Sequence, residues 1–357
     1  MPSIAAVHAV LGPHGYPQSE ITAAFAQVVA PDGEHRAVIE RIHEATSVQR
    51  RYLALPLADY AGLTGFGEAN DTFIRVGLDL GEAAITGALA QAGLTASDVD
   101  LVLTTTVTGV AAPSLEARLA PRVGFRPDVK RLPVFGLGCV AGAAGIARLA
   151  DYLVGHPHDV AVLLSVELCS LTVQRDDASM PNIVASGLFG DGAAAVVMVG
   201  AERAREMGIG GPRVVDSRSR LYPDSERTMG WDIGASGFRI VLSTGVADLI
   251  QRYLGDDVDG FLSDHDLKRR DISAWVAHPG GPKVLQAIEG ALDLSEGQLD
   301  VTWRSLAAIG NLSSSSVLHV LADTLRGEDG QPPEPGTPGL LLAMGPGFCA
   351  ELVLLQW

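Results

Sequence analysis

The chain has 357 residues, of which 47% are hydrophobic and 19% are charged. This length allows a large core, in two domains or in one duplicated unit. The formal net charge of -16 at pH 7 argues against nucleic acid as a partner, because Lys and Arg are not in excess to neutralise phosphates. An anionic ligand would have to be met by a local basic group.

The cysteines and the apolar segments narrow the class of protein further. Cys139, Cys169 and Cys349 are too few for a disulfide framework, and their spacing does not fit a zinc site. The N-terminal segment does not read as a secretion signal, and no uninterrupted apolar stretch reaches the roughly 18 residues of a membrane span. We therefore expect free thiols, no metal, no membrane span and a cytoplasmic protein.

The first half of the chain alternates predicted helices and strands. Residues 71–93 predict a helix that Asp71 caps and a glycine ends. Runs of β-branched and apolar residues predict strands at 100–107, 132–136, 159–168 and 193–200. We expect the strand at 132–136 to be short and buried, with a helix following it directly.

The second half repeats this order. Predicted helices cover 241–254, 282–292 and 313–325, and predicted strands cover 213–219, 272–281, 339–348 and 350–357. Apolar strands that alternate with helices predict sheets covered on both faces. The sequence therefore predicts an α/β protein with an internal duplication, and we place its halves at 1–205 and 206–357.

One cysteine lies where a strand is expected to turn sharply into a helix. Cys139 follows a glycine in the segment GLGCVAG, and small residues continue the helix after it. Unpaired N–H groups at a helix start favour negative charge, which predicts a lowered pKa for this thiol. A buried cysteine is more often an inert packing residue, so a nucleophile needs partners. His278 and Asn311 are candidates, because each lies in a loop at a junction between elements of the second half.

Five short segments occur in an order that is typical of one enzyme family. They are GLGCVAG (136–142), GLFGDGAAAVV (187–197), AHPGGP (277–282), GNLSSS (310–315) and MGPGF (344–348). Together they resemble the type III polyketide synthases, the chalcone synthase-like branch of the thiolase superfamily. The resemblance implies a thiolase-like fold, in which two αβαβα halves form a five-layered core. It also implies a homodimer.

The resemblance assigns roles to the three candidates. Cys139 would attack an acyl-CoA thioester and carry the growing chain. His278 would pair with the thiolate, and it would act with Asn311 to donate hydrogen bonds to the malonyl thioester oxygen during decarboxylation. The substrates are then CoA thioesters, and no further cofactor is implied.

The same resemblance extends to the substrate path. Phe189 and Phe238 match two gatekeeper aromatics, although core packing is the alternative for both. The expected CoA-binding residues are Arg41, Lys283, Gly280 and Gly281. Two other basic positions of the plant enzymes fall on Val38 and Ala45, so the contacts to the CoA phosphates differ here.

Four positions bear on the product, namely Val107, Ala112, Thr172 and Ser313, which we expect to border the substrate cavity. The bacterial tetrahydroxynaphthalene synthases have cysteine where this chain has Val107, which counts against a naphthalene product. Ala112 replaces a larger side chain that crosses into the partner's cavity, and its bond to Pro113 is a candidate cis peptide. Residues 228–238 are similar to the segment of bacterial synthases that accept long fatty acyl starters. We therefore predict an alkylpyrone or alkylresorcinol synthase.

Two rival functions share parts of this pattern. A ketoacyl-ACP synthase III-like enzyme has the same Cys, His and Asn set, but it should present a basic face to the acidic carrier protein. A non-catalytic assembly partner typically lacks the nucleophile. The starter unit, the extender, the number of extensions and the mode of cyclisation depend on cavity shape rather than on these motifs.

Overall fold

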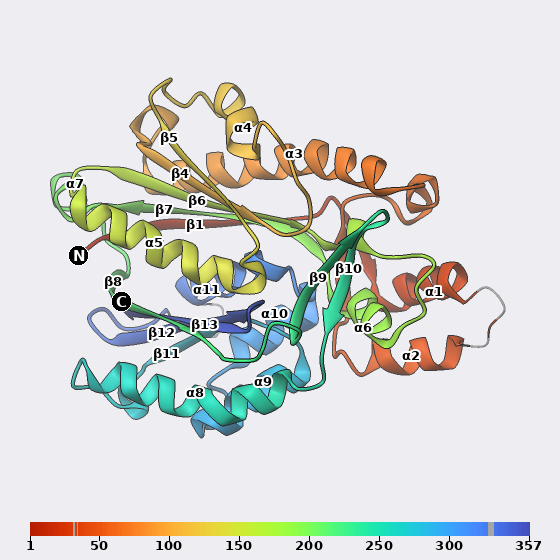
Figure 1. The fold of residues 1–357 in the computed structure, drawn as a ribbon. Helices are drawn as coiled ribbons and strands as arrows, with labels where there is room; N and C mark the ends of the chain where they lie inside the picture. The colour runs from red at the N-terminus through yellow and green to blue at the C-terminus, as the bar shows by residue number, and fades with distance from the viewer. Residues whose placement is uncertain (31–32, 34, 328–331) are drawn as a thin grey trace.

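The computed structural model describes residues 1–30, 33, 35–327 and 332–357. Two stacked halves of a sheet have helices between them and on both outer faces (Figure 1). The strands of the first half are, in spatial order, β5 (Lys130–Phe135), β4 (Leu101–Thr106), β6 (Val160–Leu168), β7 (Asp191–Val199) and β1 (Ser3–Leu11). Those of the second half are β8 (Arg213–Leu221), β13 (Cys349–Gln356), β12 (Pro338–Gly345) and β11 (Ala274–Ala277).

The two halves of this nine-stranded sheet meet at one corner. A single register pair, Ser3 with Arg213, joins β1 to β8. Between the halves lie α5 (Ala141–Gly155) and α11 (Ser316–Arg326), each in contact with strands of both halves. The outer faces carry α3 (Phe66–Ala92) and α4 (Leu115–Val123) on one side, and α8 (Val246–Ser263) and α9 (Pro282–Leu292) on the other. This is the predicted five-layered arrangement.

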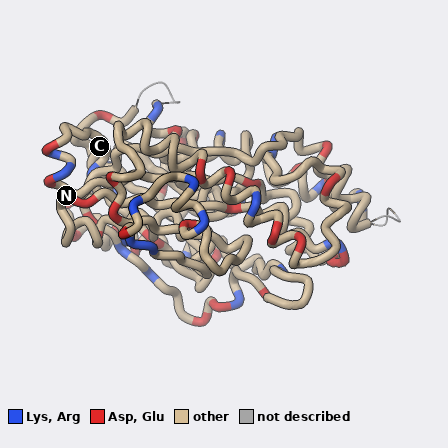
Figure 2. Tube along the Cα trace, turned by 90° about the horizontal axis from the view of Figure 1, so that it is seen from above, with Lys and Arg blue, Asp and Glu red and all other residues tan. Residues whose placement is uncertain are grey.

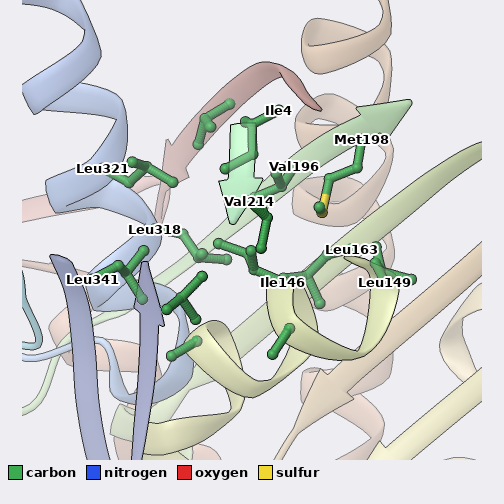
Figure 3. Packing of buried hydrophobic residues seen from close by; sticks show 14 of the residues in the cluster. Ile4, Ile146, Leu149, Leu163, Val196, Met198, Val214, Leu318, Leu321 and Leu341 are labelled. Atoms are coloured by element: carbon green, nitrogen blue, oxygen red, sulfur yellow. The ribbon is translucent and has the colours of Figure 1, made fainter. Parts of the chain in front are cut away.

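A large apolar cluster fills the central layer. Ile146 and Leu149 of α5 pack with Leu318 and Leu321 of α11 against side chains of both sheet halves (Figure 3). Small residues let the two helices approach each other. A Cβ on Gly142 of α5 would lie 2.4 Å from the carbonyl oxygen of Ser314.

Several boundaries differ from the expectations. The predicted strand at 132–136 is β5, and it is largely exposed rather than buried, because it forms an edge of the sheet. Helix α3 begins at Phe66, before Asp71, because the Glu68 carboxylate accepts the Thr64 N–H at the start of the helix. Helix α8 begins at Val246 rather than at Val241, since Val241 and Leu242 end the strand at 237–242 and a turn follows.

A smaller group of elements lies to one side of the layers (Figure 1). It contains α1 (Gln18–Val29), α2 (Arg36–Glu44), α6 (Met180–Leu188), and the separate strand pairs β2 (His14–Pro17) with β3 (Arg50–Leu53) and β9 (Met229–Gly234) with β10 (Gly237–Leu242). The remaining helices are α7 (Ala201–Met207) and α10 (Asp300–Ile309), and short 3-10 turns include η1 (Leu57–Gly62), η3 (Gly138–Val140), η4 (Cys169–Thr172) and η6 (Ser313–Ser315).

Basic and acidic residues are distributed over the molecule and are not separated into regions of one sign. Lys and Arg positions are interspersed with Asp and Glu along the trace in Figure 2. Among the residues that the structure describes, none of the helices combines the length and the hydropathy that crossing a bilayer requires. Within the same part of the chain, no group of three or more His, Cys, Asp or Glu side chains is placed to hold a metal ion.

The close contact between α5 and α11 can be tested with one added methyl group. Gly142→Ala should lower the free energy of unfolding by about 1–3 kcal/mol, because its Cβ would overlap the backbone of Ser314 in η6 and the side chain of Val317 in α11. Gly155→Ala in the same helix is the control, since nothing lies within 4 Å of its Cβ position. Denaturant unfolding of both variants checks this, and equal effects would contradict it.

Candidate active site

Cys139 lies in η3, the short turn between β5 and the central helix α5. Gly138 before it has φ +60°, and a Cβ there would lie 2.5 Å from Cδ of Pro346. Only glycine meets both the left-handed conformation and this close approach without strain. The predicted sharp turn is therefore present, and it leaves Cys139 buried at 6% exposure at the N-terminal end of α5.

The structure brings the three candidate residues to one place. Cys139, His278 and Asn311 all line a narrow cleft of about 30 Å³. His278 follows β11, and its N–H donates to the carbonyl of Leu342 at 2.9 Å. Asn311 lies between α10 and η6. The cleft has room for about one water molecule, so the three side chains border a small space.

Hydrogen bonds fix the orientation of the Asn311 amide. Its Oδ1 accepts the Ser313 N–H at 2.8 Å and lies 3.3 Å from the Ser316 hydroxyl. Because a backbone N–H can only donate, the oxygen must face these groups, and the NH₂ group is left for the cleft. The backbone of Asn311 also bridges Phe189, through bonds of 2.9 Å from Asn311 N to Leu188 O and from Gly190 N to Asn311 O.

Burial dominates the electrostatics of the thiol and the imidazole. It raises the pKa of Cys139 to about 12, against the lowered pKa expected from the helix start. The Ser313 hydroxyl, 3.6 Å from Sγ, acts in the opposite direction on this pKa. Burial also lowers the pKa of His278 to about 3. Each charge alone is costly here, but a proton transfer from Cys139 to His278 creates two charges that attract each other.

A buried carboxylate close to this site was not foreseen. Glu167 on β6 is fully buried and accepts hydrogen bonds from the hydroxyls of Thr108 at 2.8 Å and Ser314, and from the Val107 N–H at 3.2 Å. Burial raises its pKa, and its charge in turn raises the pKa of Cys139. In the sequence Glu167 is one acidic residue at the end of an apolar strand, without a distinguishing motif.

A larger cavity of about 910 Å³ begins on the other side of Cys139. Cys139, Phe189 and Met229 line both this cavity and the narrow cleft, so Phe189 lies at the boundary between the two spaces. Further lining comes from α1, η1, η4 and the β9–β10 hairpin. Of the four predicted cavity residues, Val107, Thr172 and Ser313 are among the lining residues and Ala112 is not. Phe238, predicted as a gatekeeper, also lines this cavity.

Other predicted site residues lie elsewhere. Gly280 lines the narrow cleft, whereas Gly281 is outside both linings. Arg41 and Lys283 are exposed and line neither space. Ala112 is exposed within its own chain, and its bond to Pro113 is cis, as predicted.

The five layers, together with a thiol, an imidazole and an amide in one cleft, define a condensing enzyme of the thiolase type. Family models for chalcone and stilbene synthases match almost the whole chain, the N-terminal domain over residues 2–203 and the C-terminal domain over residues 213–357. The chain belongs to this family, the type III polyketide synthases, which catalyse decarboxylative condensation of malonyl-CoA.

Relatives with different product names are similar over most of their length. A 1,3,6,8-tetrahydroxynaphthalene synthase of Streptomyces peucetius subsp. caesius is 58% identical over 99% of this chain and 93% of its own. A phloroglucinol synthase of Pseudomonas fluorescens is 30% identical over 91% of each chain. The crystal structure of the tetrahydroxynaphthalene synthase of Streptomyces coelicolor A3(2) superposes with a TM-score of 0.92 at 29% identity, covering 99% of each chain.

Timed alkylation distinguishes an activated Cys139 from a merely buried one. Cys349 is half-buried, and burial raises its pKa only to about 11, so burial alone predicts that iodoacetamide modifies Cys349 first. If His278 accepts the Cys139 proton, Cys139 should instead react at least about tenfold faster, since each unit of pKa is a factor of ten in thiolate.

The control for this experiment is His278→Gln, which cannot accept the proton and should reverse the order. Between about pH 7 and 9 the rate at Cys349 should rise about tenfold per pH unit, because this range lies below its pKa. Peptide mass spectrometry measures both rates. Labelling of Cys349 before Cys139 in the unsubstituted enzyme would show that the imidazole does not activate the thiol.

Proposed function

We propose that this enzyme carries its acyl chain on Cys139. The Cys139 proton passes to His278, the thiolate attacks the acyl-CoA carbonyl, and the CoA thiolate leaves and takes up the proton. The acyl group is then bound to the enzyme as a thioester. The observation that carries this proposal is the shared cleft of Cys139, His278 and Asn311 beside a cavity large enough for the acyl chain.

The same cleft suits the condensation step. When malonyl-CoA loses CO₂, the electron pair of the broken C–C bond forms an enolate at the thioester. The Asn311 NH₂ group and the His278 ring donate hydrogen bonds to the enolate oxygen in a site that holds little water. The enolate carbon then attacks the Cys139 thioester, which lengthens the chain by two carbons and frees the thiolate.

The volume of the cavity supports an alkyl starter and an alkylpyrone or alkylresorcinol product. Small-molecule pockets span about 300–1,000 Å³, and the cavity of about 910 Å³ is near the upper end. Val107 and Thr172 in its lining are small. A second product is favoured by the relative that is 58% identical, whose name is 1,3,6,8-tetrahydroxynaphthalene synthase. A naphthalene skeleton without an alkyl chain is built from two-carbon units alone.

The CoA moiety reaches the cleft from outside the cavity. Gly280 borders the cleft, and Gly281 and Lys283 follow it at the start of α9. We place the pantetheine arm along this segment and the phosphates near Lys283 and Arg41, which are exposed. The narrow cleft has to widen for the arm, and Phe189 is one of the side chains that border both spaces.

Product analysis tests the proposed reaction and its product together. With malonyl-CoA and saturated acyl-CoA starters from hexanoyl to palmitoyl, mass spectrometry should show starters extended by two-carbon units. Cys139→Ala should lower turnover at least about a thousandfold. Turnover of malonyl-CoA alone, or of short or aromatic starters only, would refute the alkyl product. Absence of any polyketide would refute the function.

We also propose that the enzyme is a homodimer that pairs through β5. This edge strand exposes Leu132 and Phe135, each at 46%, and edge strands with apolar side chains favour pairing with another chain. Leu132→Arg should convert a dimer into a monomer in sedimentation velocity. Val154→Arg, at an apolar position on α5 that is 72% exposed, should not. A monomeric unsubstituted enzyme would contradict the proposal.

A further inference from the structure

One wall of the large cavity is a structural unit of its own. The β9–β10 hairpin forms a two-stranded sheet separate from the nine-stranded one, and it stands apart from the layers (Figure 1). Its residues Met229, Trp231, Phe238 and Ile240 line the cavity. The position of this hairpin therefore sets the width of the cavity on that side.

A buried amide ties the turn of the hairpin to the rest of the molecule. Gln174, which is 6% exposed, lies just after η4 with its Nε2 at 3.2 Å from the carbonyl oxygens of both Ser236 and Phe238. It also lies 3.1 Å from the carbonyl of Thr172, so its two N–H groups serve three acceptors. Among the described residues, the hydrogen bonds that reach the turn of the hairpin from another element come from this side chain.

Gln174 is itself held in place by Asn182 of α6. The Asn182 amide donates to the carbonyl of Gln174 at 2.8 Å and to that of Asp177 at 2.6 Å, and its Oδ1 lies 3.4 Å from Gln174 N. Asn182 is 3% exposed. The chain of contacts therefore runs from α6 through Asn182 and Gln174 to the backbone of Phe238.

The other contacts of the hairpin restrain it less specifically. The Phe238 ring packs edge-on against Phe66, with centroids 5.3 Å apart, and its centroid lies 6.2 Å from that of Phe135. Apolar contacts of this kind are not directional. The Arg239–Asp176 pair at 3.6 Å is exposed at 46% and 74%, and exposed pairs of this kind contribute little. Among the contacts of the hairpin with other elements that the described residues make, the buried hydrogen bonds named here are thus those of the Gln174 amide.

We infer that Gln174 is a specificity-determining positioning residue, whose amide holds the hairpin and Phe238 where they discriminate between acyl chains in the cavity. The inference rests on the proposed function, in which this cavity holds the acyl chain. Apolar pockets distinguish chain lengths weakly, so a wall that moves by a small distance changes the preference. Gln174 is a positioning residue because it acts through the backbone of Phe238.

The test uses two substitutions of Gln174 and one matched control. Gln174→Glu keeps the shape but replaces the donor with an acceptor that faces two carbonyls, and Gln174→Met is a neutral variant of similar length. The control is Asp232→Asn on the same hairpin, where the 56% exposed carboxylate pairs with Arg227 rather than with Gln174.

The main readout is kcat/KM for acyl-CoA starters from hexanoyl to palmitoyl, with malonyl-CoA as extender. The ratio between the best and the poorest starter should shrink by about tenfold in both Gln174 variants, because a loose wall fits more chains equally well. Asp232→Asn should keep the ratio. A uniform loss of kcat with an unchanged ratio would indicate a structural role and overturn the inference.

A second readout does not depend on activity. Hydrogen–deuterium exchange of amides 229–242 should be faster in both Gln174 variants than in the unsubstituted enzyme, with exchange in α5 unchanged. Unchanged exchange in the hairpin would overturn the inference even if the starter ratio moved. If the unsubstituted enzyme extends no starter, the proposed function fails, and the exchange experiment still decides whether Gln174 anchors the hairpin.

Discussion

The Cys139 thiol and the His278 imidazole are both buried, and the electrostatics of the site follow from that burial. Burial raises the pKa of Cys139 and lowers that of His278, so both groups are neutral when considered alone. Among the described residues His278 Nδ1 has no hydrogen-bond partner, so no carboxylate supports a charged ring from behind. Glu167 also opposes a thiolate. The charged pair therefore depends on mutual attraction, aided by the N-terminal end of α5.

Such a charged pair requires neighbouring groups that are held in place. The buried guanidinium of Arg51 contributes to this. The Arg51 guanidinium donates to the carbonyl of Phe189 at 2.7 Å and to Gln18 at 2.8 Å. Nearby Asp191 accepts the Ala54 N–H at 2.6 Å, and burial raises its pKa to about 6. Because Phe189 is bridged to Asn311, these contacts fix the side of the cleft on which the Asn311 amide lies. The end of the cavity at Cys139, which we call the reacting end, is thus held in place by several hydrogen bonds.

The parts of this site that follow from the sequence are those with local causes. Cys139 was predicted because a glycine turn and a helix start are encoded by adjacent residues, and His278 and Asn311 because each lies in a motif at a junction between elements. Gln174 was missed because its role depends on the hairpin, which is distant in sequence. The exposure of β5 was missed because an apolar strand has the same composition at an edge of a sheet as inside it. The prediction of a lowered pKa for the Cys139 thiol was wrong, because burial outweighs the local effect of the helix start.

A fixed reacting end and a separately anchored wall, as we propose them, would let one chemistry serve different products. Relatives that align over most of their length are named for tetrahydroxynaphthalene and for phloroglucinol, which differ in size. In the proposed mechanism, a change in the reacting end disturbs the buried pair of Cys139 and His278 and stops the reaction. A change in the hairpin or in its anchor alters the space for the chain without entering the cleft. The selectivity of the enzyme can therefore diverge at Gln174 and Phe238 while the thiol, the imidazole and the amide stay in place.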